Sequence, residues 1–519
     1  MNTTPSLSGS EPRSVDVFVI GGGVNGCGIA RDAIGRGYSV ALAEMNDLAS
    51  GTSSKATKLI HGGLRYLEHY AFRLVREALG EREIVWRNAP HLVHPLRFVL
   101  PHHAGLRPAW MLRLGLFIYD HLGGPSQLPG TRKLDLRHDA AGAPLKPEFK
   151  IGFEYSDCWV DDARMVVALA QDAQARGAHI RTRCKVIDAR AVNGAWVIRT
   201  RDQHDGRDSE WQAKILINAA GPWVDHILGD VLARREPEQV RLVKGSHIIV
   251  KKIFEHDRCY IFQNGDARII FAIPYEDDFT LIGTTDIDFT GDVSTVEISA
   301  DETQYLCAAA SEYFVRPIAV SDVVSAYSGV RPLYNDHAAA AQEATRDYVI
   351  REEKIDQAPL VNIFGGKITT YRRLSESILT HIEAGLGARG ASWTKNAPLP
   401  GGDFENGDMD ALIAAILKKK PFLPAALANR LAKAYGSRTL DMLGQAQGMA
   451  DLGEDFGAGL TATEIDYLVA HEWAQTAEDI LWRRSKLGLH LPAQAAEAIN
   501  AYLAQKSVAR AAVPTDLAT

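Results

Sequence analysis

Three glycines near the start of the chain have the spacing that a bound phosphate group requires. The run Gly-Gly-Gly-Val-Asn-Gly at residues 21–26 fits the pattern G-x-G-x-x-G. Gly21 permits a tight turn, Gly23 lets the backbone approach a pyrophosphate, and Gly26 lets a helix pack closely on a strand. Glu44 follows at the distance at which a carboxylate accepts hydrogen bonds from an adenosine ribose. These residues predict a dinucleotide site.

The segments around these residues supply the elements that such a site needs. Residues 15–20 form an apolar strand, residues 27–36 a helix of small residues, and residues 38–43 a second apolar strand that ends at Glu44. Because the helix begins at the glycines, its unpaired N–H groups and the positive end of its dipole face the phosphates. We therefore predict a Rossmann-like α/β domain. A glycine-rich turn in another kind of α/β domain is the alternative.

Length, charge and cysteine content narrow the class of protein. A chain of 519 residues exceeds the usual size of one domain, so two or three domains are expected. The net charge of −7 leaves no basic excess for binding nucleic acid. The five cysteines form no C-x-x-C pair, which favours a reducing compartment and argues against disulfides and a metal site. No apolar stretch is long enough to span a bilayer.

The pattern along the chain divides it into three parts. Residues 1–14 are expected to be a disordered tail, and residues 15–390 a nucleotide-binding domain interleaved with a substrate domain, roughly 86–150 and 228–345. Strand-rich stretches between residues 240 and 290 predict an antiparallel sheet in the substrate domain. Residues 391–519 are expected to form a separate α-helical domain. Helices are predicted over 109–122, about 155–176, 409–417, 425–435, 463–482 and 493–503.

Motifs spread along nearly the whole chain identify a family. One is His-Gly-Gly-Leu-Arg-Tyr-Leu-Glu at residues 61–68, preceded by Ser-Ser at 53–54. Others are Gly-Phe-Glu-Tyr-Ser-Asp at 152–157, Lys-Gly-Ser-His at 244–247, Ile-Gly-Thr-Thr-Asp at 282–286, Tyr-Ser-Gly-Val-Arg-Pro at 327–332, Phe-Gly-Gly-Lys at 364–367, Asp-Leu-Gly-Glu-Asp-Phe-Gly at 451–457 and Trp-Arg-Arg at 482–484. By these motifs the chain resembles the FAD-dependent glycerol-3-phosphate dehydrogenases, and among them the bacterial aerobic, quinone-linked enzyme.

The resemblance implies a fold and a reaction. The family fold is α/β, with a Rossmann-like FAD-binding domain of the glucose-oxidoreductase type, an inserted antiparallel-sheet substrate domain and a C-terminal α-helical domain. The family reaction oxidises sn-glycerol 3-phosphate to dihydroxyacetone phosphate by hydride transfer to flavin N5, and the electrons pass to a membrane quinone. Two alternatives stay open: an oxygen-using FAD amine or amino-acid oxidase, whose carboxylate substrate also suits arginine, and a non-catalytic nucleotide-binding protein.

A quinone acceptor dissolves in the bilayer, so the resemblance also implies peripheral contact with a membrane. The expected location is the cytoplasmic face of the bacterial inner membrane, with the cytoplasm as the alternative. Residues 109–122, which include Trp110 and Tyr119, and the run Lys-Lys-Lys-Pro-Phe at 418–422 are candidates for this contact. A core helix and a solvated lysine face are the ordinary alternatives. A homodimer is compatible with the family, and no nucleic-acid partner is expected.

Matching to the family motifs assigns the cationic side chains to the substrate. Arg331 and Arg65 are expected to hold its phosphate, because a planar guanidinium meets two oxygens at once. Lys367 is expected to bind the substrate or to polarise its developing carbonyl group, and Tyr66 to donate a hydrogen bond to the phosphate. Ordinary ion pairs, and packing for the tyrosine, are the alternatives. Arg331 and Lys367 thus join the candidate catalytic residues.

Two histidines are candidates for the base that removes the hydroxyl proton, because histidine titrates near neutrality. His247 is favoured because it follows Lys-Gly-Ser on an expected substrate-domain strand, and His61 is expected beside the isoalloxazine ring. The residues expected to contact FAD share small side chains or a place at a strand or helix end. They are Gly21, Gly23, Gly26, Glu44, Thr52, Ser53, Ser54, His61, Gly62, Val186, Ala220, Gly221, Gly366 and Thr369.

Overall fold

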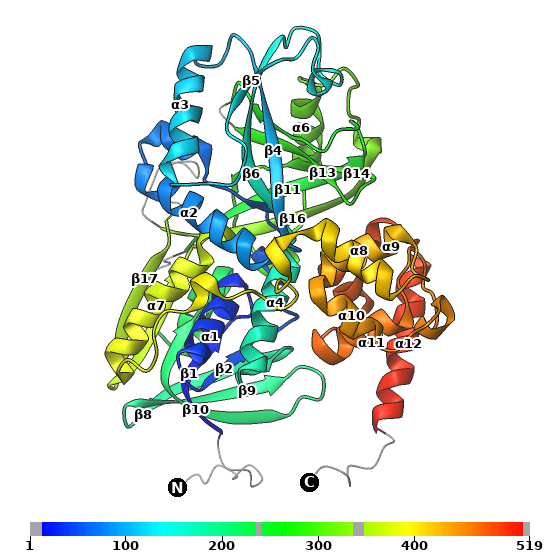
Figure 1. Cartoon of the computed structure of the whole chain (residues 1–519). Coiled ribbons are helices and arrows are strands. Elements are labelled where there is room, and N and C mark those ends of the chain that lie inside the picture. The colour runs from blue at the N-terminus through cyan, green and yellow to red at the C-terminus, as the bar shows by residue number, and fades with distance from the viewer. Residues whose placement is uncertain (1–12, 235–239, 267, 336–346, 512–519) are drawn as a thin grey trace.

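The chain folds into three bodies, which Figure 1 shows as a lower body, an upper body and a helical body at the right. The structure is a computed structural model and describes residues 13–511 apart from 235–239, 267 and 336–346. Most of the expected tail, residues 1–12, lies outside the described residues, and residues 13 and 14 already belong to the first strand. In the described part of the chain, no helix is both long and apolar enough to cross a membrane.

A largely parallel sheet forms the centre of the lower body. Its strands are β1 (Arg13–Ile20), β2 (Val40–Ala43), β7 (His179–Arg181), β8 (Cys184–Val192), β9 (Ala195–Asp202), β10 (Asp208–Asn218), β17 (Val349–Ile355) and β18 (Ala358–Phe364). The order is β17, β18, β10, β1, β2 and β7, and the antiparallel hairpin of β8 and β9 joins β10. The middle strands are apolar and buried because helices and the hairpin cover both of their faces.

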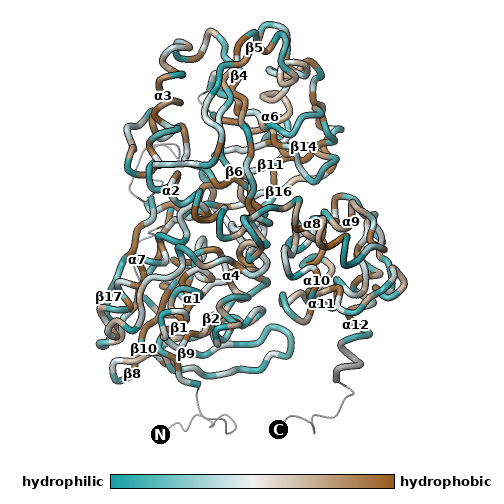
Figure 2. The backbone as a smooth tube through the Cα atoms, in the orientation of Figure 1, coloured by the Kyte–Doolittle hydropathy of each residue, from teal (hydrophilic) through white to brown (hydrophobic). Residues whose placement is uncertain are grey.

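Three helices cover one face of this sheet and confirm the predicted nucleotide-binding unit. They are α1 (Val24–Gly35), α4 (Asp162–Ala175) and α7 (Tyr371–Leu386), and α1 packs against both of the others. A Cβ atom at Gly26 would lie 2.0 Å from the carbonyl oxygen of Gly21, so only glycine lets α1 approach β1 this closely. Figure 2 shows hydrophobic residues gathered along β1 and β10 inside the lower body.

A second, mostly antiparallel sheet forms the upper body. Its strands are β3 (Leu59–Ile60), β4 (Val93–His102), β5 (Arg132–Asp135), β6 (Ile151–Val160), β11 (Val240–Lys251), β12 (Cys259–Gln263), β13 (Ile269–Tyr275), β14 (Phe279–Gly283), β15 (Ile287–Asp288) and β16 (Val323–Tyr334). The helices of this body are α2 (Phe72–Asn88), α3 (Ala109–Leu122) and α6 (Ala300–Ser311). Strands β3 and β6 belong to this sheet although they lie outside residues 86–150 and 228–345, because β6 pairs with β4 along ten residues.

The helical body is the C-terminal part of the chain and has its own apolar core. It contains α8 (Met409–Lys419), α9 (Ala425–Tyr435), α10 (Thr439–Leu443), α11 (Ala462–His471) and α12 (Gln494–Ala511). Two of the predicted helix ranges, 409–417 and 425–435, match α8 and α9, and α3 has the predicted bounds 109–122. A short helix, α5 (Val224–His226), completes the set and lies in the lower body.

Three predicted helices were wrong at one end, and one of them, expected over 493–503, continues to Ala511 as α12. The helix expected from residue 155 begins at Asp162, because the residues before it pair with β4 and the Asp161 carboxylate caps the first turn by accepting from the N–H of Arg164. The helix expected over 463–482 ends at His471, because Trp473 takes a left-handed conformation with φ +57°. A separate π-helical turn, Asp479–Arg484, follows.

Candidate active site

A cavity of about 720 Å³ lies where the two sheets meet. Its wall comes from the glycine loop before α1, from the segments 43–45, 49–53, 55–57 and 63–66, and from the ends of β8, β10 and β18. Residues of β13 and β16 close it from the upper body. Because the carboxyl ends of β1, β2 and β10 meet here, the cavity has the position expected of a ligand site in an α/β sheet.

The loop at the start of α1 is a tight turn with a fixed carboxylate beside it. Gly21 has φ +110°, and a Cβ atom there would lie 2.5 Å from the carbonyl oxygen of Ala219. The Glu44 carboxylate accepts hydrogen bonds from the N–H groups of Gly22, at 2.7 Å, and Asn46, at 2.8 Å. Burial raises the pKa of Glu44, and these two hydrogen bonds oppose the rise. The turn therefore fixes the carboxylate on the cavity wall, where the sequence predicts the adenosine ribose.

The N-terminus of α1 is open to a ligand. Gly23 is the N-cap and offers no side chain to the first turn, and no acidic residue occupies that turn. The N–H of Val24 donates to Ser53 Oγ at 3.0 Å. Asn25 Nδ2 donates to the Gly365 carbonyl at 3.2 Å, while its buried Oδ1 has no hydrogen-bond partner among the described residues. Free N–H groups, a positive dipole end and an unmet acceptor together fit the pyrophosphate of a dinucleotide such as FAD.

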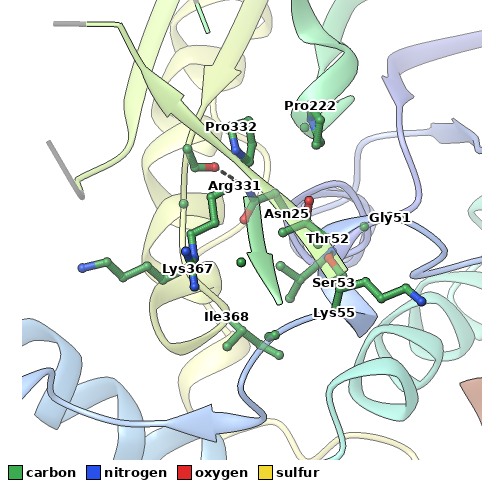
Figure 3. A pocket seen from close by; sticks show the side chains of 18 of the residues that line it. Asn25, Gly51, Thr52, Ser53, Lys55, Pro222, Arg331, Pro332, Lys367 and Ile368 are labelled. Carbon is green, nitrogen blue, oxygen red and sulfur yellow. Dashed lines mark hydrogen bonds between the residues drawn. The ribbon is translucent and has the colours of Figure 1, made fainter. Parts of the chain in front are cut away.

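Most residues expected to contact FAD lie on this cavity wall, although they come from distant parts of the chain. The wall includes Gly21, Gly23, Glu44, Thr52, Ser53, His61, Val186, Ala220, Gly221, Gly366 and Thr369. Figure 3 shows Thr52, Ser53 and Asn25 on one side of the pocket, across from Arg331 and Lys367. The residues present therefore fit the cofactor that the resemblance implies.

Three expected FAD contacts are not on the wall. Ser54 is half-buried and does not line the cavity, and its backbone carbonyl accepts a hydrogen bond of 3.2 Å from Lys58 Nζ. Gly62 is buried, and its N–H donates to Asp157 Oδ1 at 3.3 Å. Gly26 acts through the packing of α1 against β1 and not through the ligand space. For these three residues, local chemistry in the sequence could not tell the lining of a cavity from the support behind it.

Cationic side chains gather at the end of the cavity beyond the glycine loop. Arg331 Nη1 donates to Asp286 Oδ1 at 2.8 Å. Lys367 Nζ lies 4.1 Å from the centroid of the Tyr66 ring, a cation–π distance. Neither Lys367 nor Arg65 forms an ion pair with a carboxylate in the part of the chain that the structure describes. Two of these three cations are thus left for an anionic ligand.

Sequence reasoning missed four charged residues of this wall, namely Lys55, Lys185, Arg268 and Asp286. Arg268, at the start of β13, lines the same cavity, with its guanidinium 4.9 Å from the centroid of the Tyr305 ring. Asp286 was part of a motif, but nothing in its spacing indicated that it would pair with Arg331 across two strands of the sheet. Only the pairing of β15 and β16 with β11 brings Asp286 to Arg331.

His61 lies on the cavity wall, between the glycine loop and the cationic end. Its N–H is 3.3 Å from Thr369 Oγ1 at the start of the segment that leads into α7. Burial lowers the pKa of the His61 imidazole, and the charges of Lys367 and Arg82 lower it further, while the Asp157 carboxylate opposes the shift. His61 is therefore neutral near pH 7 and can accept a proton.

His247, the favoured base in the sequence analysis, does not line the cavity. The ring is buried, stacks on Tyr327 with centroids 4.9 Å apart, and its Nε2 lies 3.0 Å from Thr57 Oγ1. Thr57 is the residue that lines the cavity. Burial, followed by the charges of Arg331 and Lys58, lowers the pKa of His247 well below its usual value. His247 lies on β11 in the upper sheet, and its ring reaches the cavity only through Thr57.

Comparison with known proteins gives this geometry a family. Residues 16–366 match the family model described as FAD dependent oxidoreductase, and residues 392–506 match the C-terminal domain of alpha-glycerophosphate oxidase. Over 501 residues the chain is 50% identical to a glycerol-3-phosphate dehydrogenase of Pseudomonas aeruginosa, with 96% of each chain covered. It is 48% identical to the aerobic glycerol-3-phosphate dehydrogenase of Escherichia coli, with 94% of this chain and 97% of that protein covered.

The chain belongs to the family of FAD-dependent glycerol-3-phosphate dehydrogenases. The crystal structure of the glycerol-3-phosphate dehydrogenase of Bacillus halodurans, complexed with FAD, agrees with this over 96% of this chain and 91% of that one, at 29% identity and a TM-score of 0.76. The predicted fold class, the enzyme class and FAD as the cofactor are thereby confirmed. A glycine oxidase of Geobacillus kaustophilus, at 20% identity and a TM-score of 0.51, shares the fold alone.

A further relative bears on the substrate. Over 482 residues the chain is 49% identical to the D-erythritol 1-phosphate dehydrogenase of Brucella abortus, with 93% of this chain and 96% of that protein covered. Relatives that are about equally similar to this chain therefore carry names with two different polyol phosphates.

Proposed function

We propose that this enzyme oxidises sn-glycerol 3-phosphate to dihydroxyacetone phosphate and that its electrons pass to a membrane quinone. One observation carries the proposal: Arg65 and Lys367, two cations without a carboxylate partner in the described chain, line the same cavity as the FAD-binding loop. A phosphate dianion needs such donors, because a carboxylate already paired with them would compete for the same N–H groups. Arg331 adds a third cation to the same cavity.

The residues of the wall divide the work of the reaction. FAD, when bound, supplies the hydride acceptor at N5. Arg65 and Arg331 hold the phosphate, with Tyr66 as an additional donor. Lys367 lies where it can stabilise negative charge on the substrate oxygen as the carbonyl forms. His61, neutral because its pKa is lowered, is the residue to which we assign removal of the hydroxyl proton, in place of His247.

A second candidate substrate is D-erythritol 1-phosphate, which the similarity to the Brucella abortus relative favours. It has one carbon and one hydroxyl group more than glycerol 3-phosphate, and the same cationic wall would hold its phosphate. Arg268 lines the cavity on the β13 side and is available to an additional hydroxyl group. The two substrates therefore share a phosphate site and differ at the other end of the molecule.

The proposed quinone contact is supported by an exposed apolar surface near the cavity mouth. We define this surface by five residues that are between 41% and 80% exposed: Tyr70, Phe72, Trp110, Leu114 and Phe117. Figure 2 shows the hydrophobic residues of α3 at the outside of the upper body. Ala71 and Leu74, beside the first two of these residues, line the cavity itself. An apolar acceptor that enters from a bilayer would thus meet the flavin site directly.

The alternative membrane segment, residues 418–422, has less support. Lys420 is buried, and its Nζ donates to the carbonyl oxygens of Gly444 and Ala446 at 2.7 and 2.9 Å. Phe422 packs against the apolar core of the C-terminal domain. We therefore place the proposed contact with the cytoplasmic face of the inner membrane on the apolar surface of α3, and a homodimer remains part of the proposal.

Anaerobic mixing of the FAD-loaded enzyme with single compounds tests the reaction. Glycerol 3-phosphate should bleach the flavin absorbance, whereas unphosphorylated glycerol at the same concentration should leave it unchanged. Faster bleaching by D-erythritol 1-phosphate would favour the second candidate. Bleaching by an amino acid, with no response to either polyol phosphate, would contradict the proposal.

Flotation with vesicles that contain anionic lipid tests the membrane contact. Replacing Trp110, Leu114 and Phe117 by serine should abolish flotation, because it removes most of the apolar surface. The matched control replaces Val315, Val320 and Val324, which are similarly exposed at another site of the upper body, and should float like the wild type. Equal flotation of both triple variants would contradict the assignment to α3.

A further inference from the structure

The C-terminal domain reaches the FAD-binding loop through a buried carboxylate. Asp47 lies between Glu44 and the segment 49–53, and its side chain is almost fully buried. Arg484 donates to both of its oxygens, at 2.8 Å each, and Arg483 Nε donates to Oδ2 at 2.6 Å. Both arginines belong to the π-helical turn Asp479–Arg484. The motif Trp-Arg-Arg of the C-terminal domain therefore ends on a loop of the FAD domain, 436 residues earlier in the chain.

Besides these ion pairs, the loop that holds Asp47 is attached through the buried side chains of Leu48 and Ala49 and through backbone hydrogen bonds. The N–H of Ala49 donates to the Gly22 carbonyl at 3.1 Å, and the N–H of Ser50 donates to the Asp47 carbonyl at 3.2 Å. Glu44 and Met45 before Asp47, and residues 49–53 after it, line the cavity on the side where the adenosine half of FAD is expected. A shift of Asp47 would therefore move the groups that face the ribose and the pyrophosphate.

A second contact joins the same turn to the adenine side of the cavity. Arg183 Nη2 donates to both oxygens of Asp479, at 3.0 and 2.7 Å, and its N–H donates to the Asn46 carbonyl at 2.8 Å. The next residues along β8, Cys184 to Val186, line the cavity. The N–H of Cys184 also donates to the Glu44 carbonyl at 2.8 Å, so the two cofactor-lining segments are joined to each other as well.

From these contacts we infer that the C-terminal domain is a clamp for the adenosine half of FAD, with Asp47, Arg183, Asp479, Arg483 and Arg484 as positioning residues. None of the five lines the cavity, so each acts through the loop or strand that it holds. The inference rests on the FAD site of the family and is independent of the substrate. Because the coupling between two sites is reciprocal, bound FAD also strengthens the docking of the C-terminal domain.

The alternative is that these ion pairs only attach one domain to another. The chain offers a matched control for this alternative. Lys486 follows the same turn, is buried, and its Nζ lies 3.1 Å from Asp161 Oδ1 at the start of α4. It joins the same two bodies but touches neither cofactor-lining segment. A purely structural role predicts equal effects of Lys486 and of Arg483 on FAD binding, whereas the clamp predicts unequal effects.

The test measures FAD affinity by titrating apoprotein with FAD and following the quenching of flavin fluorescence, with thermal midpoints measured in parallel. Asp47→Asn and Arg483→Met should each raise the dissociation constant for FAD at least tenfold. Lys486→Met should leave it within twofold, even where its thermal midpoint falls as much. The double variant Asp47→Asn/Arg483→Met should bind FAD about as weakly as the weaker single variant, because both changes break one contact.

Arg183→Met gives a second route to the same answer if the Asp47 variant fails to fold. It removes the other contact at a side chain that is partly exposed, and it should also raise the dissociation constant for FAD. Dissociation constants within twofold of the wild type for both Arg183→Met and Arg483→Met would overturn the clamp. So would an increase for Lys486→Met as large as theirs. Because no substrate is added, failure of the proposed reaction cannot produce either result.

Discussion

The pair of Arg331 and Asp286 allows the substrate site to be tested by a rescue experiment. Arg331→Met removes a guanidinium that is 29% exposed from a cavity assigned to a phosphate dianion. Loss of the charge pair between this partly desolvated guanidinium and the phosphate costs about 2–5 kcal/mol, or roughly a 30- to 4000-fold decrease in kcat/KM. The variant also leaves the Asp286 carboxylate, which is 17% exposed, without this guanidinium.

Part of that cost should be repulsion between the Asp286 carboxylate and the substrate phosphate, and Coulomb's law gives its order of magnitude. Two unit charges about 6 Å apart interact by roughly 3 kcal/mol at an effective dielectric constant of about 20. Screening by solvent at this half-open site reduces the value to about 1–1.5 kcal/mol. Removing the carboxylate charge from the Arg331→Met enzyme should therefore recover about tenfold in kcat/KM.

The assay is the rate of flavin bleaching by glycerol 3-phosphate under anaerobic conditions, for the wild type, Arg331→Met, Asp286→Asn and the double variant. All four should retain FAD, because neither residue touches the glycine loop. The double variant should reduce its flavin faster than Arg331→Met, although it carries one more change. A double variant that is no faster than Arg331→Met would refute the argument that this arginine both holds phosphate and neutralises Asp286.

Three further predictions concern the base, the cofactor loop and the core. Burial lowers the pKa of His61, and the neutral imidazole is the active form. The rate of flavin bleaching should therefore fall only below about pH 6.5, and His61→Gln should remove this decrease at acid pH. A decrease that begins above that pH would contradict the assignment. Gly23→Leu should give colourless protein, since even a Cβ atom there would lie 3.1 Å from Ser53 Oγ; purification with a full complement of flavin would show that the loop geometry is wrong. Arg372→Met should lower the free energy of unfolding by about 3–5 kcal/mol, because it leaves the buried Glu81 carboxylate without its ion-pair partner. Denaturant unfolding measures this loss, and the double variant Arg372→Met/Glu81→Gln should recover part of it.

Features that depend on neighbouring residues could be predicted from the sequence. The glycines at 21, 23 and 26, the helix after them and Glu44 form a local unit, and the structure has this unit as expected. The apolar periodicity of residues 109–122 also located α3 correctly. Local signals failed where a distant partner decides: residues 155–160 were expected to begin a helix, but hydrogen bonds to β4 make them a strand.

The candidate site could be predicted as a set of residue types but not as an arrangement. Arg65, Lys367 and Arg331 were expected to bind phosphate, yet which of them keeps a free charge depends on Asp286, which only strand pairing brings to Arg331. The choice between His247 and His61 likewise depended on packing, because Thr57, which contacts the His247 ring, lines the cavity and His247 does not.

The sequence by itself determined the cofactor loop, the order of the elements and the family, because each of these is written in short runs of adjacent residues. The tertiary structure alone decided which cations stay unpaired, which histidine meets the cavity, and that Arg483 and Arg484 hold the loop of Asp47 from the other end of the chain. The physical reason is that charge pairing and burial depend on distance in space, and the packing of the three bodies sets that distance independently of separation along the chain.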